Sequence, residues 1–160
     1  MDAFTLFHVF LSLVGIATGL VVMAGLLSGR VMQAWTAIFL ATTVATSVTG
    51  FLFPFHKLLP PHIVGIISLV VLAIAIVARY AFHLRGAWRW MYVVTAATAL
   101  YLNVFVGVVQ AFQKVPSLRA LAPKQSEPPF VITQLAVLVL FITVGVFATA
   151  RFHVAVPRET

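Results

Sequence analysis

The chain has 160 residues, of which 62% are hydrophobic and 8% are charged, and its mean hydropathy is +1.13. Soluble globular domains carry a charge on roughly a quarter of their residues, so this composition excludes that class and indicates an integral membrane protein. The formal net charge of +7 comes from Lys and Arg near the ends of apolar segments, which predicts contact with membrane lipid and no nucleic-acid partner.

Five apolar segments follow one another along the chain, and each is long enough to cross a membrane. They cover residues 4–27, 32–53, 62–82, 90–112 and 130–150. At 1.5 Å per residue each helix would span at least about 30 Å, the thickness of the hydrocarbon core of a bilayer. The connections are too short to fold independently. We therefore predict an all-α fold, a single transmembrane domain over residues 1–160 built as a bundle of five transmembrane helices.

The basic residues alternate between the two sides of such a bundle. One side would carry Arg30, Arg79, Arg85, Arg89, Arg151 and Arg158, and the other Lys57, Lys114, Arg119 and Lys124. Cytoplasmic loops are usually the richer in Lys and Arg. We therefore expect a multi-pass protein of a bacterial-type cytoplasmic (inner) membrane, with its N-terminus outside and its C-terminus in the cytoplasm.

The first segment has a face of small and polar residues. His8, Ser12, Gly15 and Gly19 recur at spacings of four, three and four, which places them along one side of a helix. A Gly-x-x-x-Gly pair lets a neighbouring helix approach closely. The pattern predicts that this face packs inside the bundle and that His8, at its head, points inward.

The second and fourth segments carry polar side chains at membrane depth. The second is rich in hydroxyls, which can bond back to a carbonyl one turn earlier or reach a neighbouring helix. In the fourth, Asn103 and Gln110 lie seven residues apart and so share a face. Amides are costly in a membrane unless they are paired, so we expect both to face the bundle, where with Thr46 they would form a polar face.

The turn between the second and third segments holds two histidines. It contains Pro54, Pro60 and Pro61 and ends at His62, with His56 in its middle. A turn with three prolines has to lie at or beyond the lipid boundary. In the predicted topology His8, His56 and His62 thus share the outer end of the bundle, whereas the remaining two, His83 and His153, lie at the inner end.

These three outer histidines suggest a cofactor. A haem b in a helix bundle needs two imidazoles from different helices and a gap made by small residues. His8 and His62 are the preferred ligands, with His56 as the alternative, and Gly15, Gly19 and Gly65 would provide the clearance. The same three histidines are candidate ligands for a Zn or Cu ion, although closed sites normally add a carboxylate or thiolate and the chain has no Cys. Unpaired interfacial histidines are the simplest reading.

Three functions remain open from the sequence. The leading hypothesis is a small haem-binding or redox membrane protein that passes electrons to or from a quinone or a partner protein. The second is a non-catalytic accessory or assembly subunit, whose glycine faces dock a larger membrane complex or a second copy of the chain. The third is a pore or carrier for a small neutral solute. The carboxylates Asp2, Glu127 and Glu159 lie outside the apolar segments, which disfavours cation-coupled transport and intramembrane proteolysis.

Overall fold

A computed structural model describes residues 3–53 and 60–153, and these residues are helical apart from short connections. The elements are α1 (Ala3–Leu27), α2 (Gln33–Gly50), α3 (Pro60–Ile76), the π-helical turn η1 (Val77–Ala81), α4 (Trp88–Lys114), the short α5 (Pro116–Leu121) and α6 (Pro128–Arg151). The described residues contain no strand. The all-α prediction is therefore confirmed.

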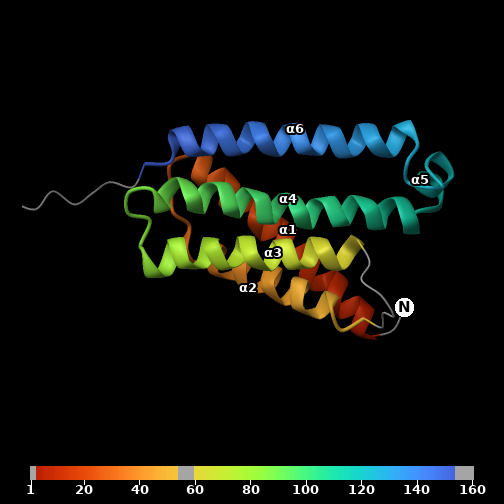
Figure 1. The fold of residues 1–160 in the computed structure, drawn as a ribbon, viewed down its shortest axis with the longest axis horizontal. Helices are drawn as coiled ribbons and strands as arrows, with labels where there is room; N and C mark the ends of the chain where they lie inside the picture. The colour runs from red at the N-terminus through yellow and green to blue at the C-terminus, as the bar shows by residue number, and fades with distance from the viewer. Residues whose placement is uncertain (1–2, 54–59, 154–160) are drawn as a thin grey trace, which may run out of the picture.

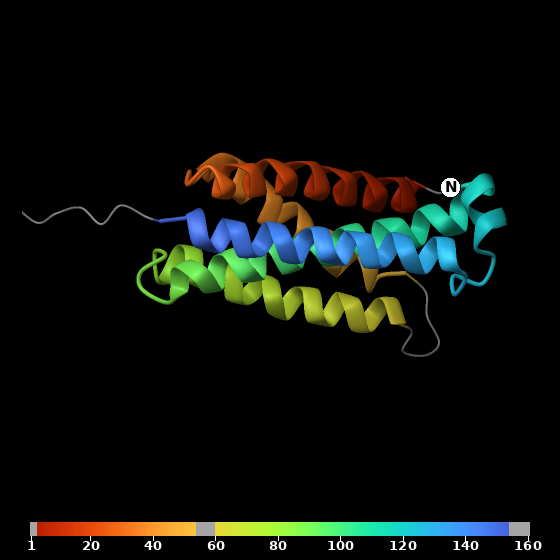
Figure 2. The ribbon, with the colours of Figure 1, turned by 90° about the horizontal axis from the view of Figure 1, so that it is seen from above.

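The five long helices lie side by side as a bundle, with α5 across one end (Figure 1). Helix α1 packs against α2, α4 and α6, and α3 packs between α2 and α4, so the direct contact of α1 with α4 forms the centre. Figure 2 shows α6 alongside both α1 and α4. The start of α1 and the whole of α5 lie at one end, called here the α5 end; η1 and the start of α4 lie at the other, the η1 end (Figure 1).

Four helices of the described chain are long and apolar enough to cross a membrane: Ala3–Leu27, His62–Ala81, Ala87–Lys114 and Pro128–Arg151. The prediction of five spans is not confirmed, and the missing span is the predicted segment 32–53. In its place α2 has 18 residues, which extend about 27 Å at 1.5 Å per residue. Its five threonines and one serine also lower its hydropathy. Helix α2 nevertheless runs within the bundle beside α1.

Glycine and alanine allow the helices to approach closely. A Cβ added at Gly19 would lie 2.6 Å from Leu100 Cδ1 and 2.8 Å from Phe39 Cε2, so neighbours on α4 and α2 occupy that space. Helices α3 and α4 also pack together, and both carry fully buried alanines, among them Ala75 and Ala96. Membrane helices associate through such small residues because lipid offers no hydrophobic drive between them. The predicted packing role of the glycine face is thus confirmed.

The outer surface of the bundle is apolar where lipid would contact it. On α6 the exposed side chains include Ile132, Leu135, Val139, Leu140, Val146 and Phe147; on α3 they include Ile63, Ile66, Ile67 and Val70. Exposed apolar helix faces of this length are what a bilayer requires. The fold is that of a membrane protein.

The connection from α4 to α6 is an ordered cap at the α5 end. Gln125, with φ of +57°, donates from Nε2 to the carbonyl of Val109 at 2.9 Å. The Glu127 carboxylate accepts the backbone N–H groups of Lys124 and Ser126, each at 3.1 Å. The Glu127 bonds shape the loop, and the bond from Gln125 holds it against α4.

Candidate functional site

His8 points into the bundle, as predicted. Its Nδ1 lies 2.8 Å from Thr49 Oγ1 on α2, and its ring meets the edge of Phe53 with centroids 5.1 Å apart. The Thr49 hydroxyl already donates to the carbonyl of Ala45 at 2.7 Å, so it accepts from an Nδ1–H of His8. This arrangement makes Nε2 of His8 the unprotonated ring nitrogen.

His62 is buried at the start of α3, at the same end of the bundle as His8. Its side chain is 8% exposed and packs beside Phe51, with ring centroids 5.9 Å apart. Phe51 also fills the space at Gly65, where an added Cβ would lie 3.0 Å from Phe51 Cζ. The two histidines therefore flank the aromatic end of α2. The third candidate ligand, His56, lies outside the described residues.

The clearance that a haem needs is occupied by side chains. Phe51 fills the space at Gly65, Leu100 and Phe39 fill it at Gly19, and Asn103 and Thr43 fill it at Gly15. The residues present do not form an open gap for a planar macrocycle at these glycines. Among the described residues, no three His, Asp or Glu side chains lie close enough together to hold a metal ion.

A polar layer crosses the centre of the bundle between α1, α2 and α4. Ser12 donates to Asn103 Oδ1 at 3.0 Å, and Asn103 Nδ2 lies 3.5 Å from the carbonyl of Ser12. Gly15, one turn further along α1, lies opposite both Asn103 and Thr43. A Cβ added there would be 3.0 Å from Asn103 Nδ2 and 3.1 Å from Thr43 Oγ1. The amide and the hydroxyl thus both border the space that a side chain at position 15 would need.

Thr43 is the unusual member of this layer. Its side chain is 1% exposed, and its Oγ1 is buried with no hydrogen-bond partner within the described chain. The hydroxyls of Thr42 and Thr46 instead bond back to carbonyls of their own helix, at 2.7 and 2.8 Å. An unpaired buried hydroxyl costs about 1–3 kcal/mol, so this oxygen calls for a ligand or a water.

The predicted polar face is therefore realised only in part. Asn103 faces the interior and is 7% exposed. The Thr46 hydroxyl donates to a backbone carbonyl of α2 itself, and Thr43 is the hydroxyl of α2 that lies beside Gly15, as the Asn103 amide does. Gln110 is only half-buried on α4. Of the three predicted residues, the structure brings Asn103 alone into the polar layer.

An apolar layer separates this polar layer from the η1 end. Phe39 and Leu100 close against Gly19, one turn below Gly15 on α1. Beyond them Tyr92 and Thr36 lie buried with their hydroxyl oxygens 3.4 Å apart. The polar side chains thus form two groups on either side of a packed apolar layer of Phe39 and Leu100.

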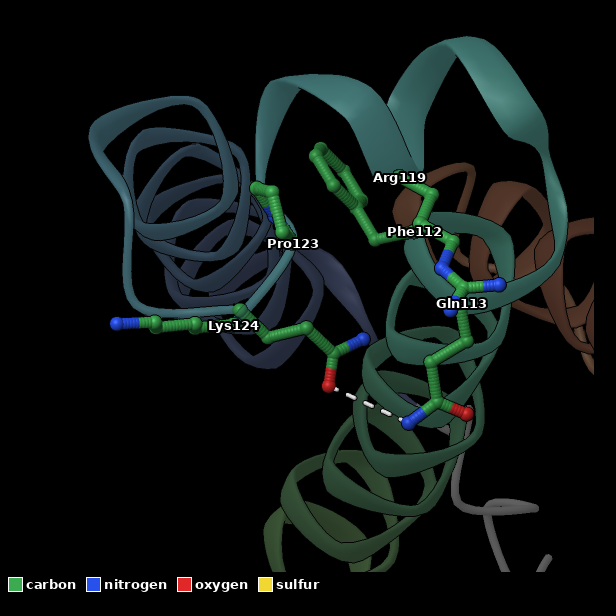
Figure 3. A pocket seen from close by; sticks show the side chains of 6 residues that line it. Phe112, Gln113, Arg119, Pro123 and Lys124 are labelled. Carbon is green, nitrogen blue, oxygen red and sulfur yellow. Dashed lines mark hydrogen bonds between the residues drawn. The ribbon is translucent and has the colours of Figure 1, made fainter.

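Two cavities lie near the ends of the bundle. Figure 3 shows the one at the α5 end, of about 340 Å³, between the last turn of α4, α5 and the following loop, with the bond from Gln113 to Gln125 across it. It is lined by Phe112, Gln113, Arg119, Pro123, Lys124 and Gln125. The second, of about 610 Å³, lies at the η1 end and contains Arg79 and His83. Neither cavity touches the polar layer.

Sequence reasoning missed the residues that surround the histidines and the second cavity. Phe51 and Phe53 sit beside His62 and His8, but aromatic residues at a helix end are too common to single out. Arg79 carried a usable signal, because a charge one turn inside an apolar segment needs a partner. Comparison with protein-family models, with curated proteins and with solved structures finds no match for this chain.

Proposed function

We propose that the protein is a membrane carrier or pore for a small neutral polar solute, which binds in the polar layer of Ser12, Gly15, Thr43 and Asn103. One observation supports this proposal most directly: the buried, unpartnered hydroxyl of Thr43 and the amide of Asn103 both lie within 3.1 Å of the point that a Gly15 Cβ would take. Polar groups at membrane depth are costly, and they mark substrate pathways in membrane proteins.

The chemistry of the layer defines the class of solute. Thr43 Oγ1 can donate and accept a hydrogen bond, and the second N–H of Asn103 Nδ2 can donate one. No side chain of this layer carries a formal charge. The layer therefore suits an uncharged molecule with hydroxyl or carbonyl groups rather than an ion. Because Asn103 and Thr43 fill the space at Gly15, a solute can enter the layer only when these side chains move apart.

The proposed path has to open at the apolar layer around Gly19. Passage of a solute toward the η1 end would require Phe39 and Leu100 to separate from Gly19. The Thr36 and Tyr92 hydroxyls lie beyond this apolar layer and would receive the solute after opening.

Reconstitution in liposomes tests the proposal. Osmotic swelling with glycerol and with urea as probes is expected to be faster for vesicles that contain the protein than for empty vesicles. Asn103→Leu is expected to abolish the difference while the variant remains folded. Rates equal to those of empty vesicles for both probes would remove the carrier function.

One observation favours a second candidate, a cofactor-binding protein. With Nδ1 of His8 engaged by Thr49, its Nε2 is oriented as in histidines that bind metals and haems, where the other ring nitrogen is hydrogen-bonded. The filled glycine positions weigh against a haem at the predicted place. An absorption spectrum of the purified protein decides this candidate, since bound haem gives an intense Soret band and the carrier gives none.

The accessory-subunit hypothesis gains less support. It relied on glycine faces that dock partner proteins, whereas Gly15 and Gly19 pack against α2 and α4 of the same chain.

The orientation in a bacterial-type inner membrane also belongs to the proposal. Among the described residues, Arg30, Arg79, Arg85, Arg89 and Arg151 belong to the η1 end and Lys114, Arg119 and Lys124 to the α5 end. The positive-inside rule then assigns the η1 end to the cytoplasm. The test is a reporter enzyme that works only in the periplasm, fused after Thr160. We expect the fusion to show no activity, and an active fusion would reverse the assignment.

A further inference from the structure

A basic cavity opens at the η1 end, away from the polar layer. It has a volume of about 610 Å³ and is lined by Gln33, Ala34 and Ala37 of α2, by Arg79 and Tyr80 of η1 and by His83 just after η1. Three of these side chains are hydrogen-bond donors: the guanidinium of Arg79, the amide of Gln33 and the hydroxyl of Tyr80. His83 donates from at least one ring nitrogen. The lining is rich in donors and carries a fixed positive charge.

Arg79 has no anionic partner in the described chain. Its Nε is buried without a hydrogen-bond partner, and its Cζ lies 5.9 Å from the centroid of the Tyr80 ring. The one carboxylate side chain in the described ranges is Glu127, at the opposite end of the bundle. The Arg79 side chain is half-buried, with its Nε enclosed by the protein and the side chain lining the cavity. A guanidinium in such a place forms its strongest hydrogen bonds with an anion.

The backbone around Arg79 is also unusual. Residues Val77–Ala81 form a π-helical turn, and His83 and Leu84 then adopt φ values of +50° and +59°. A bond from the N–H of Leu84 to the carbonyl of Ala78, at 3.0 Å, holds this turn. π-Helical turns and left-handed non-glycine residues both concentrate at functional sites. Here they bring the side chain of His83 to the wall that contains Arg79.

We propose that this cavity binds the phosphate headgroup of an anionic phospholipid. The planar fork of a guanidinium matches phosphate oxygens, and Gln33, Tyr80 and His83 add donors around it. Trp35, Ile38 and Val77 lie exposed on the same two elements and offer an apolar surface for acyl chains. An apolar surface on the elements that line the cavity favours a lipid over free phosphate. The inference is independent of the solute path.

Native mass spectrometry of the full chain in detergent tests the site. Phosphatidylglycerol and phosphatidylcholine are titrated as probes, and the ratio of their affinities is the readout. The wild-type protein is expected to prefer phosphatidylglycerol. Arg79→Gln is expected to reduce that preference about fivefold or more, the effect of one basic residue at an anionic lipid surface.

Arg85→Gln is the matched control, because Arg85 is exposed at the same end, carries the same charge and does not line the cavity. It is expected to keep the preference within about twofold. Arg79→Lys retains the positive charge and is expected to keep part of the preference for phosphatidylglycerol. This variant provides a readout if Arg79→Gln fails to fold. Equal losses in Arg79→Gln and Arg85→Gln, or no preference in the wild type, would overturn the site. Equally strong stabilisation of the protein by inorganic phosphate alone would assign the cavity to a free anion and overturn the lipid assignment.

Discussion

Ser12 of α1 donates a 3.0 Å hydrogen bond to the side-chain oxygen of Asn103 of α4, a residue 91 positions away in the sequence. This bond joins the two central helices of the bundle at membrane depth. It also orients the Asn103 amide so that its nitrogen lies beside Gly15. The polar layer and the packing of the bundle centre therefore depend on the same pair of residues.

A double-mutant cycle should detect this pair. Hydrogen bonds between membrane helices contribute on average about 0.6 kcal/mol and at most about 1.7 kcal/mol. We expect Ser12→Ala and Asn103→Leu, alone and combined, to give a coupling energy in that range when unfolding is followed in mixed detergent micelles. Strictly additive effects would contradict the bond.

Gly19→Leu should destabilise the bundle, because a Cβ at that position already overlaps Leu100 and Phe39. Overpacking of this kind costs about 1–3 kcal/mol. Ala17→Leu is the control, since Ala17 lies exposed two residues away on the same helix. The thermal midpoint in detergent is expected to fall for Gly19→Leu and to stay near the wild-type value for Ala17→Leu. Equal midpoints for the two variants would refute the close contact.

Much of the bundle follows from the sequence alone. Long apolar segments and short connections predict the helices, and the Gly15–Gly19 spacing predicts which face of α1 packs inward. The predicted end of the second segment, residue 53, lies beyond the end of α2 at Gly50. The prediction was too long because Phe51 and Phe53 continue the apolar pattern of the segment. Hydropathy cannot mark the end of a helix that is followed by aromatic residues, and it does not show that these residues contact the histidines.

The site was less predictable. Asn103 was identified because an amide at membrane depth needs a partner. The choice between Thr43 and Thr46 depends on how α2 is rotated against α1, and every threonine of the segment can bond back to its own helix. Only the packing at Gly15 separates Thr43 from the rest.

Glu127 should make the cap at the α5 end sensitive to acid. Partial desolvation raises the pKa of Glu127, but the backbone N–H groups of Lys124, Ser126 and Glu127 and the charge of Lys124 outweigh it and lower the pKa below its ordinary value of 4.5. The ionised Glu127 carboxylate therefore stabilises the folded protein above the pKa that Glu127 has in the unfolded state. This stabilisation is lost as the pH falls through the lower pKa of the folded state. Glu127→Gln should melt below the wild type at pH 7, and the difference should vanish in strong acid. A difference that is independent of pH would exclude this role.

The central claim is that the unpartnered hydroxyl of Thr43 contacts the solute. Thr43→Val removes that hydroxyl with little change in shape, and because Oγ1 has no partner among the described residues, thermal stability should stay level or rise. Thr143→Val is the control, since Thr143 lies exposed on α6 and bonds back to Val139 at 2.8 Å.

Osmotic swelling of proteoliposomes with glycerol and with urea, compared for the wild type, Thr43→Val and Thr143→Val, is the most direct test of this account. We predict that Thr43→Val loses most of the protein-dependent flux at unchanged stability, whereas Thr143→Val keeps it. Flux through Thr43→Val equal to that of the wild type would contradict the account.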